Sequence, residues 1–336
     1  MIQVTGTGIR RWADRRTFLL SAGLGAALAA PAIARAQGRF PTRPVRVICA
    51  YGVGGTADVV SRILCNWMSQ NTGQQFVVEN RGGAAGTIAA NAVVNAPADG
   101  YTLLYDATAH SVNPSLFGAR LPYNTERQLM PVFLSMVAPN TINVHRDFGA
   151  RTVPELIAIA KASPGGLDAG STGVGSAQHI SLELFNKMAD VRINHVTYRD
   201  TPAVRNDMLA RRIALHLSNV PGSVPVLQIP EARVLCHAGV VPVEVLPGVE
   251  AIATTLPGYE TYEWNGIFAP AGTSSEIIQY LNTTFNRAIQ APAVAELLRT
   301  LGAVTRANTP DECASFRQAQ MALHGSIVRD ANIRIE

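Results

Sequence analysis

The sequence predicts an α/β protein of two lobes with a ligand cleft between them, and three observations support this prediction. A predicted strand, a glycine-rich loop and an amphipathic helix follow one another over 49–70. The same order of strand, small-residue loop and helix recurs over 167–188. About 300 residues follow an N-terminal leader, which is more than one hydrophobic core usually serves. Because ligands of such folds bind at the carboxyl ends of the strands, both loops are expected to face one cleft.

The first 36 residues read as a secretory leader of the twin-arginine type. Arg15 and Arg16 precede an apolar run over 19–33, and Ala34-Arg35-Ala36 forms an A-x-A cleavage site. The run is short, is rich in alanine and glycine, and carries Pro31 near its end, which argues against a membrane anchor. We therefore expect export of the chain and cleavage of a signal peptide, residues 1–36, after Ala36.

Without this leader the chain carries no formal net charge. The leader holds five of the 28 basic residues and one of the 24 acidic residues, which leaves 23 of each. Lys161 and Lys187 are the only lysines, and no basic run with interleaved aromatic residues occurs. The basic balance of the complete chain is therefore no evidence for binding to nucleic acid, and we expect no nucleic-acid partner.

The cysteines and histidines do not have the spacing of metal ligands. Cys49, Cys65, Cys236 and Cys313 form no C-x-x-C pair and lie beside apolar residues, so we interpret them as small buried hydrophobic side chains. An oxidising compartment would permit a disulfide, but the spacing cannot predict one. We expect no metal and no cofactor, and we expect a monomer.

The first strand, loop and helix form a predicted anion receptor. Residues 45–51 are expected to form the end of a strand. Apolar residues from Val59 to Met68 recur at helical spacing. The glycines between them permit positive φ and close approach of a ligand, and Thr56 is expected to cap the helix. Since the first N–H groups of a helix have no internal partner, this loop suits a phosphate or a carboxylate.

Strands and helices alternate after this unit. We expect a strand over 76–78, a glycine-rich loop over 81–87, a helix over 88–94 and a strand over 101–105. This β-α-β-α-β order predicts a parallel sheet with right-handed crossovers. Residues 114–123 are expected to be irregular, with at most a short turn of helix.

The chain is expected to cross between the lobes twice. Two extended segments, 132–138 and 141–144, lead into the second lobe near Pro139-Asn140, and the return lies near 262–265. We therefore predict a first lobe of 37–139 plus 264–336 and a second lobe of 140–263. Two crossings of this kind favour hinge closure around a solute.

The second lobe and the C-terminal part repeat these patterns. Thr152 and Glu155 form a capping-box pattern at the start of a helix that is expected to end near Ala162. Ser274 or Ser275 is expected to cap the first of three C-terminal helices. The remaining expected elements are strands at 167–170, 191–196, 213–217, 234–238 and 264–269, helices after 176 and after 201, a loop over 239–258, and helices over 293–301 and 310–328.

Short motifs along nearly the whole mature chain resemble one family in composition and order. They are Tyr51-x-Val53-Gly54-Gly55-Thr56-x-Asp58, the Val-Glu-Asn-Arg and Gly-rich segment 78–87, Asp-Gly-Tyr-Thr-Leu-Leu at 99–104, Asn-Pro-Ser-Leu at 113–116, the loop 170–179, and 268–273. These segments resemble the Bug receptors, the solute-binding components of tripartite tricarboxylate transporters.

The resemblance implies a two-lobed type II periplasmic binding-protein fold, also called a Venus flytrap. It implies a periplasmic receptor, not an enzyme, that holds a small organic carboxylate through loop amides, hydroxyls and waters. It also implies delivery of that carboxylate to membrane transporter subunits. Some members of the family serve sensing, so a sensor kinase is the alternative partner.

Two departures from the family pattern concern the cleft. The first loop usually carries phenylalanine and two prolines before its glycines, whereas Ala50-Tyr51-Gly52-Val53 stands here and offers a phenol. Ser218 stands where the family often has aspartate, so no acid is expected at that position. If that aspartate meets an ammonium group in relatives that bind amino acids, its loss argues against an amino-acid ligand. Measurable binding of aspartate or glutamate would refute this hypothesis.

The ligand-binding candidates lie on the loops at the predicted strand ends. Asp58 and His179 also have structural interpretations, as a carboxylate that favours a helix N-terminus and as a side chain that pairs behind its loop. The candidates are Tyr51, Val53, Gly54, Gly55, Thr56, Asp58, Ala84, Thr108, Ser171, Gly175, Ser176, His179, Tyr198 and Asn219.

Two classes of enzyme are the alternatives to a receptor. Ser171, Ser176 and His179 could serve as nucleophile and base of an exported hydrolase, but no G-x-S-x-G elbow is present. The glycines of the first loop could bind a nucleotide, but the loop lacks a full G-x-G-x-x-G and a Walker lysine. Hydrolysis of generic esters by the mature chain would favour the hydrolase.

Overall fold

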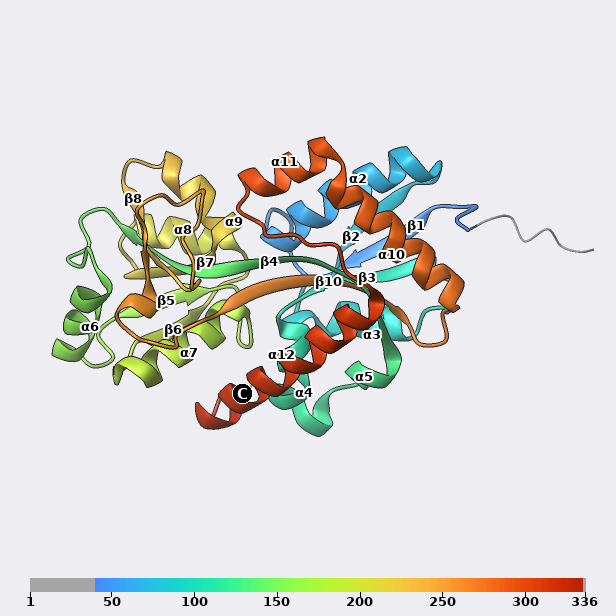
Figure 1. The fold of residues 1–336 in the computed structure, drawn as a ribbon. Helices are drawn as coiled ribbons and strands as arrows, with labels where there is room; N and C mark the ends of the chain where they lie inside the picture. The colour runs from blue at the N-terminus through green and yellow to red at the C-terminus, as the bar shows by residue number, and fades with distance from the viewer. Residues whose placement is uncertain (1–39, 335–336) are drawn as a thin grey trace, which may run out of the picture. The chain divides into compact units, whose positions relative to one another are not determined.

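The structure is a computed structural model that describes residues 40–334. The predicted signal peptide and its cleavage site lie outside the described residues. The described part holds a sheet with the strand order β2-β1-β3-β10-β4-β7-β5-β6; beside this path β8 pairs with β4, and β9 pairs with β8. Two sets of parallel strands are thus joined through the antiparallel pair β10 and β4 (Figure 1).

The first set of strands has the predicted parallel order. β1 lies between β2 and β3 and pairs with both in parallel, and β3 pairs with β10 in the antiparallel sense. The elements of this part are β1 Val45–Cys49, α2 Thr56–Thr72, β2 Phe76–Asn80, the 3₁₀ turn η1 Ala84–Gly86, α3 Thr87–Val94, β3 Thr102–Ala107, α4 Ala109–Phe117, the 3₁₀ turn η2 Gly118–Arg120 and α5 Thr125–Gln128.

Two details of this part differ from the sequence predictions. Thr56 does not cap α2, because Gly55 occupies the N-cap position and the Thr56 hydroxyl donates to Asn219 Oδ1 at 2.9 Å. The segment expected to be irregular begins inside α4, which continues through Pro114. The Asn113 amide anchors this helix by donating to the Ala85 carbonyl at 2.8 Å. Gly73 ends α2 with a φ of +73°, as predicted.

The strands β4 (Leu129–His145) and β10 (Tyr262–Pro270) connect the two sets. β4 is one continuous strand where two extended segments were predicted. It pairs with β10 over Leu129–Pro139, and from Asn140 onward it pairs with β7 and β8. The partners of β4 therefore change at the predicted crossing point, while the exact division into lobes remains a prediction.

The second set repeats the parallel arrangement. β5 lies between β6 and β7 and pairs with both in parallel. Its elements are α6 Val153–Ala162, β5 Asp168–Ser171, α7 Ala177–Ala189, β6 Asn194–Thr197, α8 Thr201–Leu209, β7 Leu215–Asn219, α9 Val220–Ser223, the 3₁₀ turn η3 Val224–Gln228, β8 Ala232–His237, β9 Glu250–Ala251 and the 3₁₀ turn η4 Ile252–Thr254.

Three C-terminal helices complete the fold, namely α10 Ser275–Gln290, α11 Pro292–Thr300 and α12 Pro310–Asp330. Ser274 caps α10 by accepting from the Ile277 amide, as one of the two predicted alternatives. α12 begins with a full capping box of Thr309 and Glu312 and packs against α4 and β4. The three C-terminal helices thus pack against α2, α4 and β4 (Figure 1).

All four cysteines are buried and free, which agrees with their interpretation as small hydrophobic side chains. Burial raises the pKa of Cys49 and of Cys313 to about 12. Within the described residues, no helix is long and apolar enough to cross a membrane.

Candidate functional site

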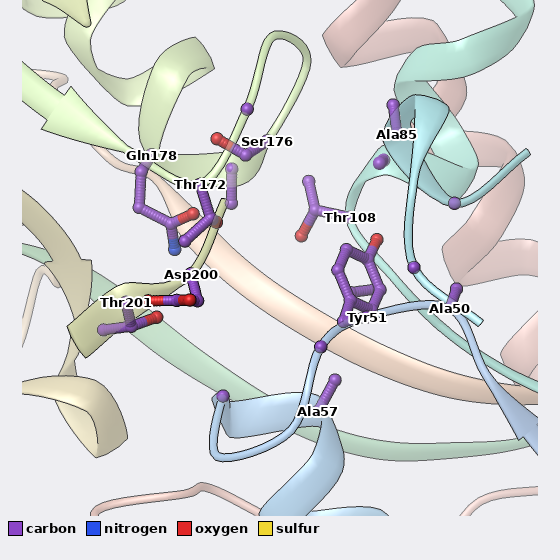
Figure 2. A pocket seen from close by; sticks show the side chains of 18 of the residues that line it. Ala50, Tyr51, Ala57, Ala85, Thr108, Thr172, Ser176, Gln178, Asp200 and Thr201 are labelled. Carbon is purple, nitrogen blue, oxygen red and sulfur yellow. The ribbon is translucent and has the colours of Figure 1, made fainter. Parts of the chain in front are cut away.

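A cavity of about 900 Å³ opens where the carboxyl ends of both sets of parallel strands face each other. Figure 2 shows side chains of the two sets on opposite sides of it, with Tyr51 and Thr108 facing Thr172, Ser176 and Gln178. The loops after β1, β2 and β3 supply one wall, and the loops after β5, β6 and β7 supply the other. This placement follows the rule for ligand sites in parallel α/β sheets.

Several helices begin at this cavity. The first residues of α2, α4, α7 and α8, together with the 3₁₀ turn η1, all line it. The N–H groups of a first helical turn lack internal partners and carry a partial positive charge. Converging helix N-termini therefore offer partial positive charge and N–H donors to an anion, although few basic side chains line the cavity.

The loop before α3 has an unusual backbone. Gly83 and Gly86 have φ of +120° and +83°, and between them Ala84 and Ala85 have φ of +45° and +53°. Residues with a Cβ rarely adopt these angles, and such strain gathers at functional sites. The bond from Asn113 to the Ala85 carbonyl holds the loop in this form. It turns a glycine-rich segment toward the cavity.

Nine of the predicted candidates line the cavity. They are Tyr51, Val53, Gly55, Thr56, Ala84, Thr108, Ser176, Tyr198 and Asn219. The other five, Gly54, Asp58, Ser171, Gly175 and His179, are not among the residues that line it. Contact with a ligand remains a prediction for all of them.

Asp58 stabilises the first loop from behind. Its Oδ2 accepts from the Gly54 amide at 2.9 Å, and its Oδ1 accepts from Asn80 Nδ2 at 2.8 Å and from Arg62 Nε at 2.9 Å. Burial opposes the charge of Asp58, but the three donors prevail and lower the pKa of this carboxyl group. The structural interpretation of Asp58 therefore accounts for all of these contacts.

His179 and Ser171 support the loop of the second set. His179 Nδ1 accepts from the Gly175 amide at 3.2 Å, and its ring stacks on His195 at 4.0 Å between centroids. Burial, followed by the neighbouring His179, lowers the pKa of His195 to about 3. A neutral His195 can accept the Ser171 hydroxyl at 2.7 Å from its Nε2. Ser171 is fully buried, so this pair lies behind the cavity wall.

Tyr51 and Tyr198 line the cavity but have internal partners for their hydroxyls. Tyr51 donates to Asp106 Oδ1 at 3.1 Å, and Asp106 Oδ2 meets His110 Nδ1 at 3.1 Å. Tyr198 donates to Asp207 Oδ2 at 2.9 Å. The phenol of Tyr51 therefore positions the loop instead of standing free as a donor.

The predicted candidates do not include eight polar residues of the cavity wall, namely Thr172, Gln178, Thr197, Arg199, Asp200, Thr201, Ser218 and Glu263. Asp200 is the N-cap of α8, accepting from the Ala203 amide at 2.9 Å, and its position before Thr201-Pro202 could have revealed this cap. Gln178 lies in the first turn of α7. Glu263 lies in β10 just before the predicted strand over 264–269, and no pattern in the sequence indicates a side chain of the cavity at this position.

Within the described residues, no group of histidine, cysteine, aspartate and glutamate side chains could hold a metal ion. The polar groups of the cavity wall are amides, hydroxyls, carboxylates and the guanidinium of Arg199. This donor set can hold an anion by hydrogen bonds, directly or through waters.

Comparisons with known proteins agree with this geometry. Residues 60–333 match the model of a family described as the tripartite tricarboxylate transporter family receptor. A protein from Pseudomonas sp. strain P51, described as a UPF0065 protein in the tcbD-tcbE intergenic region, is 34% identical over 283 residues, covering 84% of each chain. Protein BugT of Bordetella pertussis is 29% identical over 322 residues, covering 95% of this chain and 96% of its own.

Solved structures share the fold. Rpa4515 of R. palustris, solved with adipate, is 32% identical with a TM-score of 0.84, covering 88% of this chain and 99% of its own. MatC (Rpa3494) of Rhodopseudomonas palustris, solved with bound malate, is 26% identical with a TM-score of 0.80, covering 86% and 100%. This chain therefore has a type II periplasmic binding-protein fold and belongs to the Bug family of tripartite tricarboxylate transporter receptors.

Proposed function

We propose that this chain is an extracytoplasmic receptor that binds a small organic carboxylate in the cavity and delivers it to the membrane subunits of a tripartite transporter. The observation that carries the proposal is the convergence of helix N-termini from both sets of strands on one cavity. The adipate and malate bound by two structural relatives support a carboxylate as the ligand.

Hinge closure is the proposed mode of capture. Two strands, β4 and β10, carry the chain between the two halves, and the Thr56 hydroxyl reaches Asn219 from the other half. A ligand that bonds to amides on both walls would stabilise the closed arrangement by its extra contacts there. A receptor that signals to a sensor kinase would use the same closure.

A thermal-shift panel on mature protein from Gln37 tests the ligand class. The panel holds dicarboxylates, tricarboxylates, aromatic acids and amino acids, each beside its primary amide. A ligand at a hundredfold excess over its Kd stabilises the folded state by about 2.7 kcal/mol. We expect at least one carboxylate to raise the midpoint while its amide does not. Equal shifts for acid and amide, or hydrolysis of generic esters, would count against the proposal.

We also propose that the chain reaches the periplasm by twin-arginine export and is cleaved after Ala36. The Arg15-Arg16 pair, the short apolar run and the A-x-A site support this. Replacing both arginines by lysine keeps the charge, and we expect it to leave the full-length precursor in the cytoplasmic fraction. Continued appearance of the mature chain in the periplasmic fraction would refute this route.

A further inference from the structure

Glu263 places a buried carboxylate in the wall of a cavity that otherwise suits an anion. The residue lies near the start of β10, opposite Ala138 of β4, and is 9% exposed. Its Oε2 accepts from Gln178 Nε2 at 2.7 Å and from Asn219 Nδ2 at 2.5 Å, and its Oε1 lies 3.3 Å from Asn265 Nδ2. An acid in this place demands an explanation that the binding of a simple carboxylate does not provide.

The orientation of both close amides is fixed by backbone groups. Asn219 Oδ1 accepts from the Gly222 amide at 2.8 Å, so its Nδ2 must face Glu263. Asn140 Nδ2 faces the Ala177 carbonyl, so its Oδ1 must accept from Gln178 Nε2, which also reaches Glu263. Oε2 of Glu263 therefore accepts two hydrogen bonds, while Oε1 has, among residues 40–334, the single contact of 3.3 Å with Asn265.

No cation compensates Glu263 within the described residues. Arg199 is the only basic side chain among those that line the cavity; it is 96% exposed and lies 3.7 Å from Asp200. None of the ion pairs of the described residues includes Glu263. Burial raises the pKa of Glu263, because taking a carboxylate out of water is costly without an opposite charge nearby. The three amide donors act in the opposite direction but do not cancel this effect.

We propose that Glu263 selects, among small carboxylates, those that also carry a protonated amine. This inference rests on the proposed function, because it assumes that the helix N-termini hold the carboxylate of the ligand. The ammonium group would supply the missing cation at Oε1 of Glu263, where an acceptor position is open. A second carboxylate on the ligand would meet a like charge there, so the residue also acts against dicarboxylates.

This proposal replaces the hypothesis that the absence of an acid at position 218 argues against an amino-acid ligand. The loss of an acid at position 218 does not leave the cavity without one, because Glu263 reaches Asn219, the neighbour of Ser218, from a different strand. Glu263 of β10 therefore supplies an acid to the part of the cavity wall that also holds Ser218 and Asn219.

Matched ligand sets test this selection by isothermal titration calorimetry on mature protein. Each set shares one carboxylate and one carbon skeleton and varies the far group among amine, methyl and carboxylate. The sets are β-alanine, propionate and malonate; 4-aminobutanoate, butanoate and succinate; and 6-aminohexanoate, hexanoate and adipate. We expect the amine to bind at least tenfold more tightly than both other members in at least one set.

The variant Glu263→Gln keeps the size and the acceptor for both amides but removes the charge. We expect it to lose the amine preference and to bind the dicarboxylate of that set at least as well as the wild type does. Glu276→Gln makes the same change at an exposed residue of α10 and should leave all affinities within twofold. If Glu276→Gln keeps the wild-type order of ligand affinities, the loss of amine preference in Glu263→Gln is specific to position 263.

Three results would contradict these expectations in different ways. Carboxylate binding without an amine preference in the wild type overturns the role of Glu263 and leaves the receptor function intact. An amine preference that survives in Glu263→Gln also overturns it. Absence of binding for every carboxylate in all sets and in the thermal-shift panel would count against the proposed function itself, and the inference would fail with it.

Discussion

At the residue scale, the loop over 171–176 depends on a glycine that does not line the cavity. Gly175 has a φ of +80°, and a Cβ at this position would lie 2.6 Å from Leu116 Cδ2. Leu116 belongs to a buried apolar cluster with Val112 and Ile180, which joins α4 to α7. Gly175 thus lets the loop approach α4 and leaves its amide for His179.

Gly175→Ala should therefore destabilise the protein through both strain and crowding. Gly248 has a φ of +76° with open space around it, so Gly248→Ala measures the strain alone. Left-handed backbone costs an alanine about 1–2 kcal/mol, and overpacking adds about 1–3 kcal/mol. We expect urea unfolding to give Gly175→Ala a loss at least 1 kcal/mol larger than that of Gly248→Ala. Equal losses would show that Leu116 yields without cost.

Residue patterns predicted the hydroxyl and glycine content of the cavity better than its charges. Thr108 and Ser176 follow strand ends, where the topological rule expects ligand groups, and both line the cavity. Glu263 could not be predicted in this way, because its burial depends on amides of Gln178 and Asn219, which lie far from it in the sequence. Side-chain partners from distant segments leave no periodic signal in one chain.

At the element scale, β4 shows why two predicted segments form one strand. Pro139 has no N–H to donate and so resembles a strand terminator in sequence. In the structure it lies where β4 changes partner, and the next amide, that of Asn140, bonds to the Thr261 carbonyl at 3.1 Å. The missing donor is therefore placed where the ladder is already interrupted. The helix α4 likewise continues through Pro114, which a sequence pattern alone does not favour.

A side chain completes the irregular part of β4. The register of β4 with β10 shifts on both sides of the Leu134 region. Asn308 accepts from the Leu134 amide at 3.0 Å and donates to its carbonyl at 2.9 Å, so its side-chain amide acts like a neighbouring strand. Periodicity predicted the helices on either side of Asn308. It could not predict the two hydrogen bonds to Leu134, because they join residues far apart in the sequence.

At the scale of the whole molecule, the order of elements and the two crossing points followed from the sequence, but the pairing of the two crossing strands with each other did not. Alternation of strands, glycine loops and amphipathic helices predicted both parallel sets. Their connection through the long pair β4 and β10 depends on pairing between residues more than a hundred positions apart, such as Trp264 with Val137. That pairing brings Glu263, on a crossing strand, to the wall of the cavity.

The central claim is that the cavity holds a carboxylate at converging helix N-termini, and a matched pair of variants at Ser176 tests it most directly. Ser176 caps α7 by accepting from the His179 amide at 3.2 Å, and both asparagine and aspartate are good N-caps. Ser176→Asn and Ser176→Asp therefore share a size and a cap but differ in charge.

Calorimetry with the strongest carboxylate of the panel would compare these two variants, with thermal unfolding as the control for their stability. Repulsion between carboxylates of about 1–4 kcal/mol corresponds to a loss of affinity between about fivefold and several hundredfold, and about 1.4 kcal/mol gives tenfold. We predict that Ser176→Asp binds at least tenfold more weakly than Ser176→Asn while both unfold at similar temperatures. Equal affinities of the two folded variants would contradict the claim that the ligand carboxylate lies at the start of α7.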